Sequence, residues 1–211
     1  MLALAILVHV LIQSISPSGL FWNFNGDTID RLPKDWETRG NSRHAIYRIL
    51  EEADGNRYLG AKSDDDDVQL GIQVNLRAEQ LPILSWRWRV SVLPRGGNER
   101  QSKTLDSAAS VYAVFGSRLL PRILKYVWST SVPAGTTFPH PSSGRMMIIV
   151  VDSGSDSLGQ WKSVSRNLSV DYEKAFGSRP PNLIALGVKT DSDSTRTTAR
   201  ADYDDIRLAR Q

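Results

Sequence analysis

From residue 20 onward, apolar and polar residues alternate with a period of two along most of the chain. The segment 68–76 alternates Val, Leu, Ile, Val and Leu with Gln, Gly, Gln and Asn. The segment 82–93 repeats the pattern, with Trp86 and Trp88 on one face and Arg87 and Arg89 on the other. Because successive side chains of a β-strand point to opposite faces, each segment buries one face and exposes the other. Both are predicted strands, and core packing is favoured for the two tryptophans.

Six further runs have the length and the β-branched or aromatic content of strands. They are residues 45–50, 110–115, 123–129, 146–151, 183–189 and 199–208. Turn sequences separate them, among them Asp-Gly-Asn at 54–56 and Pro-Arg-Gly-Gly at 94–97. One short helix is predicted at 169–176, capped by Ser169 and ended by Gly177. Many short strands without long helices between them predict an all-β fold, an antiparallel two-sheet sandwich of about ten strands. Its expected architecture is jelly-roll-like, as in carbohydrate-binding modules or concanavalin-like domains.

An apolar run at residues 2–12, followed by small and polar residues at 14–19, has the form of a secretory leader. The run is too short to span a bilayer as a helix. No Lys or Arg precedes it, His9 interrupts it, and it lacks an Ala-x-Ala cleavage site. We therefore expect a signal peptide or apolar leader at 1–19 and a single sandwich domain at 20–211, located in the periplasm or secreted. The alternatives are a buried first strand and a fragment whose true start lies upstream.

Composition removes several classes of function. The 211 residues contain no cysteine and three histidines, which excludes thiolate chemistry and disfavours zinc sites and Ser-His-Asp triads. The net charge of +3 comes from 26 basic and 23 acidic residues without a basic block, so nucleic acid is not an expected partner. No stable transmembrane span is expected, and the oligomeric state is left open.

Several short motifs follow one another along the chain in an order similar to that found in one bacterial family. They are Leu-Ser-Trp-Arg-Trp-Arg-Val at 84–90, Asp-Ser-Ala-Ala-Ser-Val-Tyr at 106–112, Tyr-Val-Trp-Ser at 126–129, Thr-Asp-Ser-Asp-Ser-Thr at 190–195 and Tyr-Asp-Asp-Ile at 203–206. The chain resembles the domain of unknown function 3047 (DUF3047) from residue 21 to the C-terminus. The resemblance implies an exported β-sandwich domain and supplies no activity. Ser107 and Ser194 depart from the family pattern, where a second aspartate and an asparagine are usual, and this weakens a polar site built on them.

Carboxylates offer the remaining route to catalysis. A glycosidase needs two carboxyl groups about 5 to 10 Å apart, one with a raised pKa. Weak catalytic candidates are Glu99, Asp106 and Asp171, and for a loop pair such as Glu99 and Asp106 ion pairing with Arg100 or Lys103 is favoured over catalysis. The sequence favours no catalysis, and no cofactor is expected apart from a possible calcium ion.

The calcium hypothesis rests on alternating oxygen ligands. Asp191, Asp193 and Thr195 stand at every second position of an exposed segment, and Ca²⁺ takes carboxylate and hydroxyl oxygens. The alternative is that these side chains form turns with the neighbouring backbone.

The ligand-binding hypothesis rests on aromatic and charged residues together. Six tryptophans are many for this length, and a Trp face suits a sugar ring. The predicted ligand-binding residues are Trp36, Trp161, Arg166, Asp191 and Asp193, with Arg166 and Lys125 as positive partners for an acidic sugar. We expect a non-catalytic domain that binds a saccharide or another cell-envelope ligand. The alternatives are a glycoside hydrolase or polysaccharide lyase using paired carboxylates, and an envelope structural or interaction protein without a small ligand.

Overall fold

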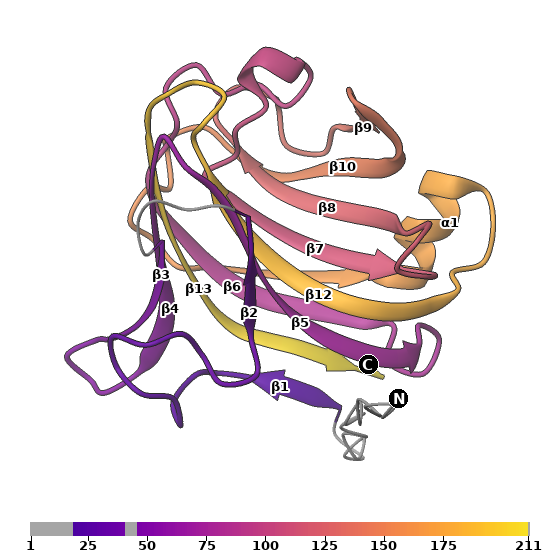
Figure 1. The fold of residues 1–211 in the computed structure, drawn as a ribbon, viewed down its shortest axis with the longest axis horizontal. Helices are drawn as coiled ribbons and strands as arrows, with labels where there is room; N and C mark the ends of the chain where they lie inside the picture. The colour runs from indigo at the N-terminus through magenta and orange to yellow at the C-terminus, as the bar shows by residue number, and fades with distance from the viewer. Residues whose placement is uncertain (1–18, 41–45, 211) are drawn as a thin grey trace, which may run out of the picture.

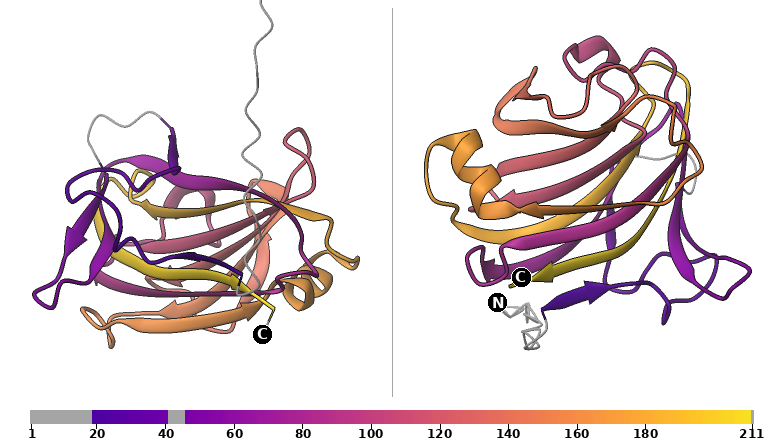
Figure 2. Two further views of the ribbon diagram at one scale, coloured as in Figure 1. Left: turned by 90° about the horizontal axis from the view of Figure 1, so that it is seen from below. Right: turned by 180° about the vertical axis from the view of Figure 1, so that it is seen from behind.

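A computed structural model describes residues 19–40 and 46–210, which fold into two β-sheets packed face to face. The two layers are seen edge-on in Figure 2. One sheet has six strands in the order β11-β6-β13-β4-β3, with β1 paired to β13. Its strands are β1 (Leu20–Trp22), β3 (Tyr47–Glu51), β4 (Arg57–Asp64), β6 (Ile83–Val92), β11 (Lys162–Asn167) and β13 (Thr198–Ala209).

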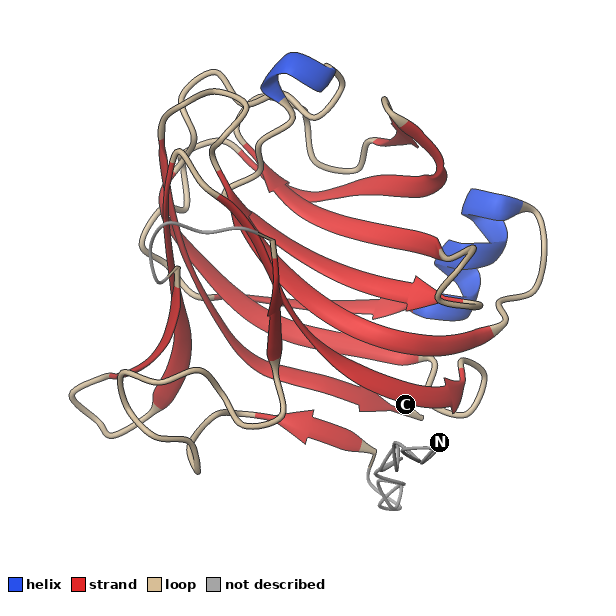
Figure 3. Cartoon of the chain, viewed as in Figure 1, coloured by secondary structure: helices blue, strands red, loops and turns tan. Residues whose placement is uncertain are grey.

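The second sheet has seven strands in the order β2-β5-β12-β7-β8-β10-β9 and faces the viewer in Figure 1. Its strands are β2 (Glu37–Arg39), β5 (Asp67–Arg77), β7 (Ala109–Phe115), β8 (Arg122–Ser129), β9 (Thr137–His140), β10 (Ser143–Ser153) and β12 (Asn182–Asp191). Helical structure in the described ranges is confined to the 3₁₀ turn η1 (Ser102–Thr104) and the helix α1 (Leu168–Phe176), as Figure 3 shows. This confirms the predicted all-β, two-sheet sandwich with one short helix.

The strand pairs are antiparallel with one exception. Strands β8 and β10 run parallel, with Met146 opposite Ile123, because β9 occupies the sheet edge and returns the chain to β10. The expectation of a wholly antiparallel sheet is therefore wrong at this pair, since alternation of side chains does not encode strand direction.

Aromatic side chains fill the space between the sheets. Trp86 and Trp88 of β6 are almost fully buried, as predicted from their alternation. The Trp86 ring lies 5.4 Å from the ring of Tyr126, and the Trp88 ring lies 6.1 Å from that of Trp128, both on β8 of the opposite sheet. Aromatic pairs at this spacing add to the free energy gained by burying their area.

All eight strand segments predicted from the sequence are strands in the structure, within a few residues at each end. Strands β1, β2, β4, β9 and β11 were not predicted, and thirteen strands replace the expected ten or so. The predicted leader at 1–19 lies almost wholly outside the described residues. Within the described ranges, no helix has the length and apolar character needed to cross a bilayer.

Helix α1 begins one residue earlier than predicted. Its N-cap is Asn167, whose side-chain oxygen accepts hydrogen bonds from the backbone N–H groups of Ser169 and Val170, each at 3.1 Å. Ser169 therefore lies inside the helix rather than at its cap. Gly177 ends the helix at φ 67°, as predicted for a left-handed C-cap.

Candidate functional site

Two tyrosines of the six-stranded sheet fix the end of β12, where the candidate site lies. The hydroxyl of Tyr47 donates to Val68 O at 2.6 Å and accepts from Thr190 N at 3.2 Å. The hydroxyl of Tyr203 donates to Lys189 O at 2.8 Å and accepts from Ser110 N at 3.2 Å. Burial raises the pKa of both tyrosines, so both hydroxyls keep their protons at neutral pH. The two side chains thus hold β12 in place from the core side.

The outer face of the seven-stranded sheet carries a row of residues defined by strand register. Gly71, Gly187, Tyr112 and Lys125 lie side by side on β5, β12, β7 and β8. The neighbouring residues of β8 on either side, Leu124 and Tyr126, belong to the main core, so Lys125 points to the outer face. We call this surface the outer face throughout.

Gln69 lies flat across the outer face because Gly187 leaves room for it. A Cβ atom added at Gly187 would lie 2.7 Å from Gln69 Nε2, closer than a carbon atom can approach. The amide of Gln69 therefore rests against the strand of Gly187, beside Tyr112 in the next strand.

Lys125 is a buried cation without a carboxylate partner. Lys125 is 2% exposed, and no described carboxylate lies within ion-pair distance of its ammonium group. Its ammonium lies 5.7 Å from the centre of the Tyr112 ring. Burying an ammonium without a partner is costly, and the field of this charge is correspondingly strong. Burial and this charge lower the pKa of His140 on β9, and the charge also opposes the burial that raises the pKa of Asp191.

Lys189 lies on the same face and binds two carboxylates. Its Nζ is 2.5 Å from Asp67 Oδ1 and 2.8 Å from Asp191 Oδ2. Burial acts to lower the pKa of Lys189, but Tyr112, Asp191 and Asp67 raise it by more. Burial raises the pKa of Asp191 to about 7, against the opposing effects of Lys189 and Lys125. Asp191 Oδ1 and Ser110 Oγ are buried without a hydrogen-bond partner among the described residues.

Three more cations of the outer face lack a carboxylate partner among the described residues. Arg39 lies opposite Gln69 at the β2 edge, Arg118 donates to Gln73 Oε1, and Arg77 ends β5. On the six-stranded sheet, in contrast, most strand cations form ion pairs, although Arg200 of β13 has none among the described residues. Arg87 pairs with Asp204 and Asp205, Arg89 with Glu52 and Asp202, Arg48 with Asp30, Arg57 with Glu51, and Lys62 with Asp64.

Trp161 belongs to this paired face. The guanidinium carbons of Arg87 and Arg89 lie 4.8 and 4.5 Å from the centre of its ring. Its Nε1 donates to Glu52 Oε1 at 3.2 Å, and the Tyr58 ring meets it edge-on. The ring surface that was expected to hold a sugar is thus largely taken by two arginines.

The other predicted aromatic, Trp36, lies in the core. It is 5% exposed and its ring meets Trp22 and Phe24 edge-on. Trp36 therefore offers no exposed ring face to a sugar.

The three carboxylates considered for catalysis are all buried and are each held by neighbouring donors. Glu99 accepts hydrogen bonds from the hydroxyls of Ser107 and Ser129. Asp171 accepts from Tyr126 Oη at 2.9 Å and forms a two-contact ion pair with Arg166. Arg166, a predicted ligand-binding residue, is thus engaged by Asp171 instead.

The third of these carboxylates, Asp106, lies beside the predicted metal ligands. Its oxygens accept from Ser194 N, Thr195 N and Thr195 Oγ1. The structure therefore brings Asp106, Asp191 and Asp193 together and places Thr195 as the residue that holds Asp106.

Sequence reasoning missed Tyr112 and Lys189 as members of one site with Lys125. Alternation along each strand places all three on the outer face, but only the register between strands makes them neighbours. That register joins segments far apart in the sequence.

Comparisons with known proteins place the chain in a family. The model of a family described as a protein of unknown function, DUF3047, matches residues 34–207. The FAD-dependent monooxygenase prhF of Penicillium brasilianum is 31% identical over 113 residues, which are 52% of this chain and 23% of that enzyme. The chain thus spans about a quarter of that relative.

Solved structures with a similar fold have low sequence identity. A mannan-recognising carbohydrate-binding module, TmCBM27, is 12% identical with a TM-score of 0.45, over 92% of this chain and 97% of that one. The K2 adhesin domain of Lys-gingipain is 9% identical with a TM-score of 0.48, over 90% and 97%. A cellulase derived from Cel12A of Rhodothermus marinus is 12% identical with a TM-score of 0.42, over 90% and 98%.

Proposed function

Since the chain belongs to the DUF3047 family, whose description assigns no function, we propose from the outer face that it binds an acidic saccharide. In this proposal the protein holds the saccharide without chemical change. The binding surface is the outer face of the seven-stranded sheet, from Arg39 and Gln69 at one edge to Lys125 near the centre.

The contrast between the two sheet surfaces carries the proposal. Most cations of the six-stranded sheet, Arg87 and Arg89 among them, are neutralised by carboxylates within the chain. On the outer face Arg39, Arg118 and Lys125 have no such partner among the described residues. Glu37, opposite Gly71, lies on the same face, but the unpaired cations outnumber it, and an excess of charge of one sign attracts a ligand of the opposite sign.

The polar groups around these cations favour a sugar over a compact anion. Gln69 and Gln73 present amide groups along the sheet surface, and the largely buried Tyr112 lies beside them in the register of the strands. Such groups exchange hydrogen bonds with hydroxyls, while the cations meet a carboxylate. Glycines at 71 and 187 leave the middle of this surface low. A uronic-acid polymer offers both hydroxyls and evenly spaced carboxylates.

Isothermal titration with polygalacturonate oligosaccharides tests the proposal, with EDTA present so that calcium cannot bridge protein and sugar. We expect binding to the acidic oligosaccharide and none to a neutral glucan of equal length. The double variant Arg39→Gln/Arg118→Gln should weaken binding about tenfold, because each lost cation contributes up to about 1 kcal/mol at an exposed site.

Arg48→Gln is the matched control, since it removes an exposed arginine from the six-stranded sheet. It should leave the affinity unchanged. Equal weakening by the control and the double variant, or equal binding of acidic and neutral oligosaccharides, would contradict the proposal.

Hydrolysis or β-elimination is the second candidate, and Lys189 is the observation that favours it. One ammonium contacts both Asp67 and Asp191, so two carboxylates lie close together on the outer face. Incubation with polygalacturonate, followed by assays of reducing ends and of unsaturated products by ultraviolet absorbance, separates the two functions. Turnover that Asp67→Asn abolishes would replace the binding function with an enzymatic one.

We also propose export, supported by the apolar run at 2–12. Fractionation of a bacterium expressing the chain with a C-terminal tag should place it in the periplasm or the medium. Retention in the cytoplasm would argue against an envelope ligand.

A further inference from the structure

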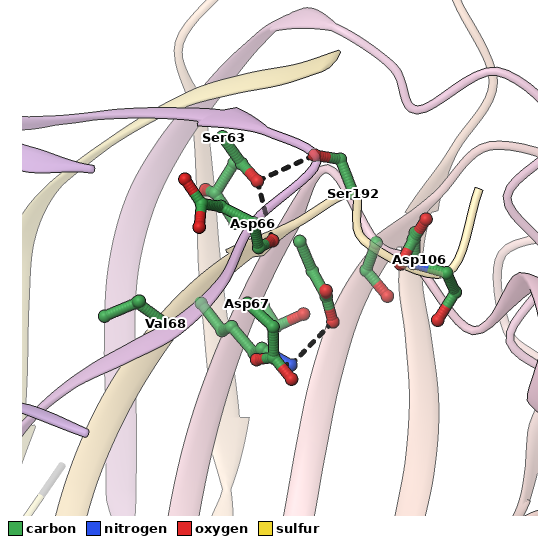
Figure 4. A network of polar contacts seen from close by, with 12 residues as sticks. Ser63, Asp66, Asp67, Val68, Asp106 and Ser192 are labelled. Carbon is green, nitrogen blue, oxygen red and sulfur yellow. Dashed lines mark hydrogen bonds and ion pairs between the residues drawn. The ribbon is translucent and has the colours of Figure 1, made fainter. Parts of the chain in front are cut away.

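Three carboxylates meet where β12 leaves the seven-stranded sheet. Asp191 is the last residue of β12, Asp193 follows in the loop, and Asp106 precedes β7. One oxygen from each lies within 4.8 Å of the others. Figure 4 shows Asp106 beside this loop, with Asp67 and the linked pair of Ser63 and Ser192 nearby.

The second observation is a buried carboxylate oxygen that nothing satisfies. Asp191 is 4% exposed, and its Oδ1 has no hydrogen-bond partner among the described residues. Its other oxygen, Oδ2, is bound by Lys189 at 2.8 Å. Leaving a buried charged oxygen without a partner costs several times the worth of an ordinary hydrogen bond. Lys189 satisfies only half of this carboxylate.

The surrounding loop holds the cluster in a fixed shape. Asp106 accepts Ser194 N at 3.2 Å, Thr195 N at 2.7 Å and Thr195 Oγ1 at 2.6 Å. Ser192 O accepts Thr197 N at 3.1 Å, which closes the loop on itself. Asp193 is exposed, so the cluster can be reached from solvent.

We propose that Asp106, Asp191 and Asp193 form a calcium site, with Asp191 Oδ1 as its buried ligand. Oxygens bound to one Ca²⁺ at 2.3–2.6 Å lie no more than about 5 Å apart, which the cluster satisfies. Water completes the coordination on the exposed side next to Asp193. Calcium suits the site better than magnesium, because the ligands come from two segments in irregular directions and Mg²⁺ demands a near-ideal octahedron.

The site lies next to the outer face and is independent of sugar binding. Lys189 contacts Asp191 through Oδ2, so the lysine and the cation would use different oxygens of this carboxylate. The proposal does not require an acidic ligand, and binding of the metal alone tests it.

The experiment measures calcium binding to the full chain after EDTA has been removed by dialysis. Isothermal titration with CaCl₂ should give one site, and the melting temperature should rise with CaCl₂ and return on adding EGTA. At a free calcium concentration 100 times the dissociation constant, the stabilisation corresponds to about 2.7 kcal/mol. MgCl₂ at the same ionic strength should give a much smaller rise.

Asp193→Asn and Asp191→Asn are the test variants, and Asp65→Asn is the matched control. Asp65 is an exposed aspartate of the neighbouring β4–β5 turn. Its backbone N–H donates to Ser192 Oγ, a contact that the substitution keeps, and its carboxylate is not one of the three in the cluster. Both test variants should weaken calcium binding at least tenfold, and the control should bind as the native chain does. Since Asp193 is exposed, its variant should fold even if the Asp191 variant does not.

Two results would overturn the proposal. One is a folded native chain that binds no calcium at 10 mM CaCl₂. The repulsion among the three carboxylates would then be offset by Lys189 and by a proton shared between them. The other is calcium stabilisation of equal size in Asp193→Asn and in the native chain, which would indicate general screening of the acidic end of the molecule.

Discussion

At the scale of single residues, the Tyr203 hydroxyl bridges the two sheets at three points. It donates to Lys189 O, accepts from Ser110 N and lies 2.9 Å from Thr190 Oγ1. All three partners belong to the sheet that carries the outer face. A buried hydroxyl with several partners is worth more than an ordinary hydrogen bond, because its removal leaves those partners unsatisfied.

Tyr203→Phe should therefore lower the free energy of unfolding by about 1–3 kcal/mol. Urea unfolding followed by tryptophan fluorescence measures this. Tyr172→Phe is the control, since the Tyr172 hydroxyl accepts only one long contact, 3.4 Å from Arg122. A loss no greater in Tyr203→Phe than in the control would contradict the bridging role.

His140 is a residue whose protonation reports on the outer face. Burial, Lys125 and Lys189 lower its pKa below the usual 6.5. Because the folded chain binds this proton less tightly than the unfolded chain does, His140 contributes stability above pH 6.5 that is lost as the pH falls through its folded pKa. Proton NMR of the histidine signals should give a midpoint below 6.5.

Lys125→Met should raise that midpoint, and saturating polygalacturonate should raise it in the native chain. His140→Gln should flatten the stability curve on the acidic side of neutrality. A midpoint unaffected by Lys125→Met would contradict the electrostatic link between the two residues.

At the scale of elements, the N-terminus of α1 is capped by Asn167 and not by Ser169, which the sequence predicted. Asn167 accepts two backbone N–H groups, whereas Ser169 Oγ is buried without a partner. Asn167→Ala should therefore destabilise the chain by about 0.5–2 kcal/mol. Ser169→Ala should be close to neutral in the same thermal unfolding experiment. A larger loss of stability in Ser169→Ala than in Asn167→Ala would instead support Ser169 as the N-cap.

Strand prediction succeeded for the long apolar or alternating segments, and it missed the short exposed strands β2 and β9 as well as β4. Segment 68–76 alternates because β5 buries one face only, and it was identified from the sequence. In β4, Leu59, Gly60 and Ala61 are buried in succession, so alternation breaks down. At Gly60 a Cβ would lie 2.5 Å from the end of the Leu50 side chain, which would have to move to make room for it. A glycine inside a strand resembles a turn residue when only the sequence is considered, which is one reason why β4 was not predicted.

The candidate sites show the same division between local and long-range information. Asp191 and Asp193 were identified because they lie two residues apart in one segment, so their proximity can be inferred from the sequence. Asp106 was identified as an acid but not as their neighbour, because the pairing of β12 with β7 brings it there. The partnerless state of Lys125 likewise depends on what packs around it, and a list of residue types does not contain that information.

At the scale of the whole molecule, the two sheet surfaces differ in how their charges are neutralised. On the six-stranded surface Arg87 and Arg89 are neutralised by carboxylates of the same sheet and its loops, so these charges serve mainly to stabilise the fold. The outer face leaves Arg39, Arg118 and Lys125 without carboxylate partners among the described residues, so its electrostatics are available to a ligand. The net charge of +3 conceals this asymmetry, because an even distribution would give the same total.

Salt should therefore separate binding from folding. Raising NaCl from 0.1 M to 1 M shortens the Debye length from about 10 Å to about 3 Å, which screens charges that act across solvent more than it screens partly buried pairs in contact. Affinity for polygalacturonate should fall at least about tenfold, since steering and neutralisation by an ionic ligand both depend on unscreened charge. The melting temperature of the free chain should change by only a few degrees, because Arg87 and Arg89 keep their carboxylates in direct contact.

Calorimetric titration and thermal unfolding in the same two buffers measure both quantities. Affinity that is insensitive to salt would mean that hydrogen bonds from Gln69, Gln73 and Tyr112 dominate, and the ligand would then be a neutral sugar.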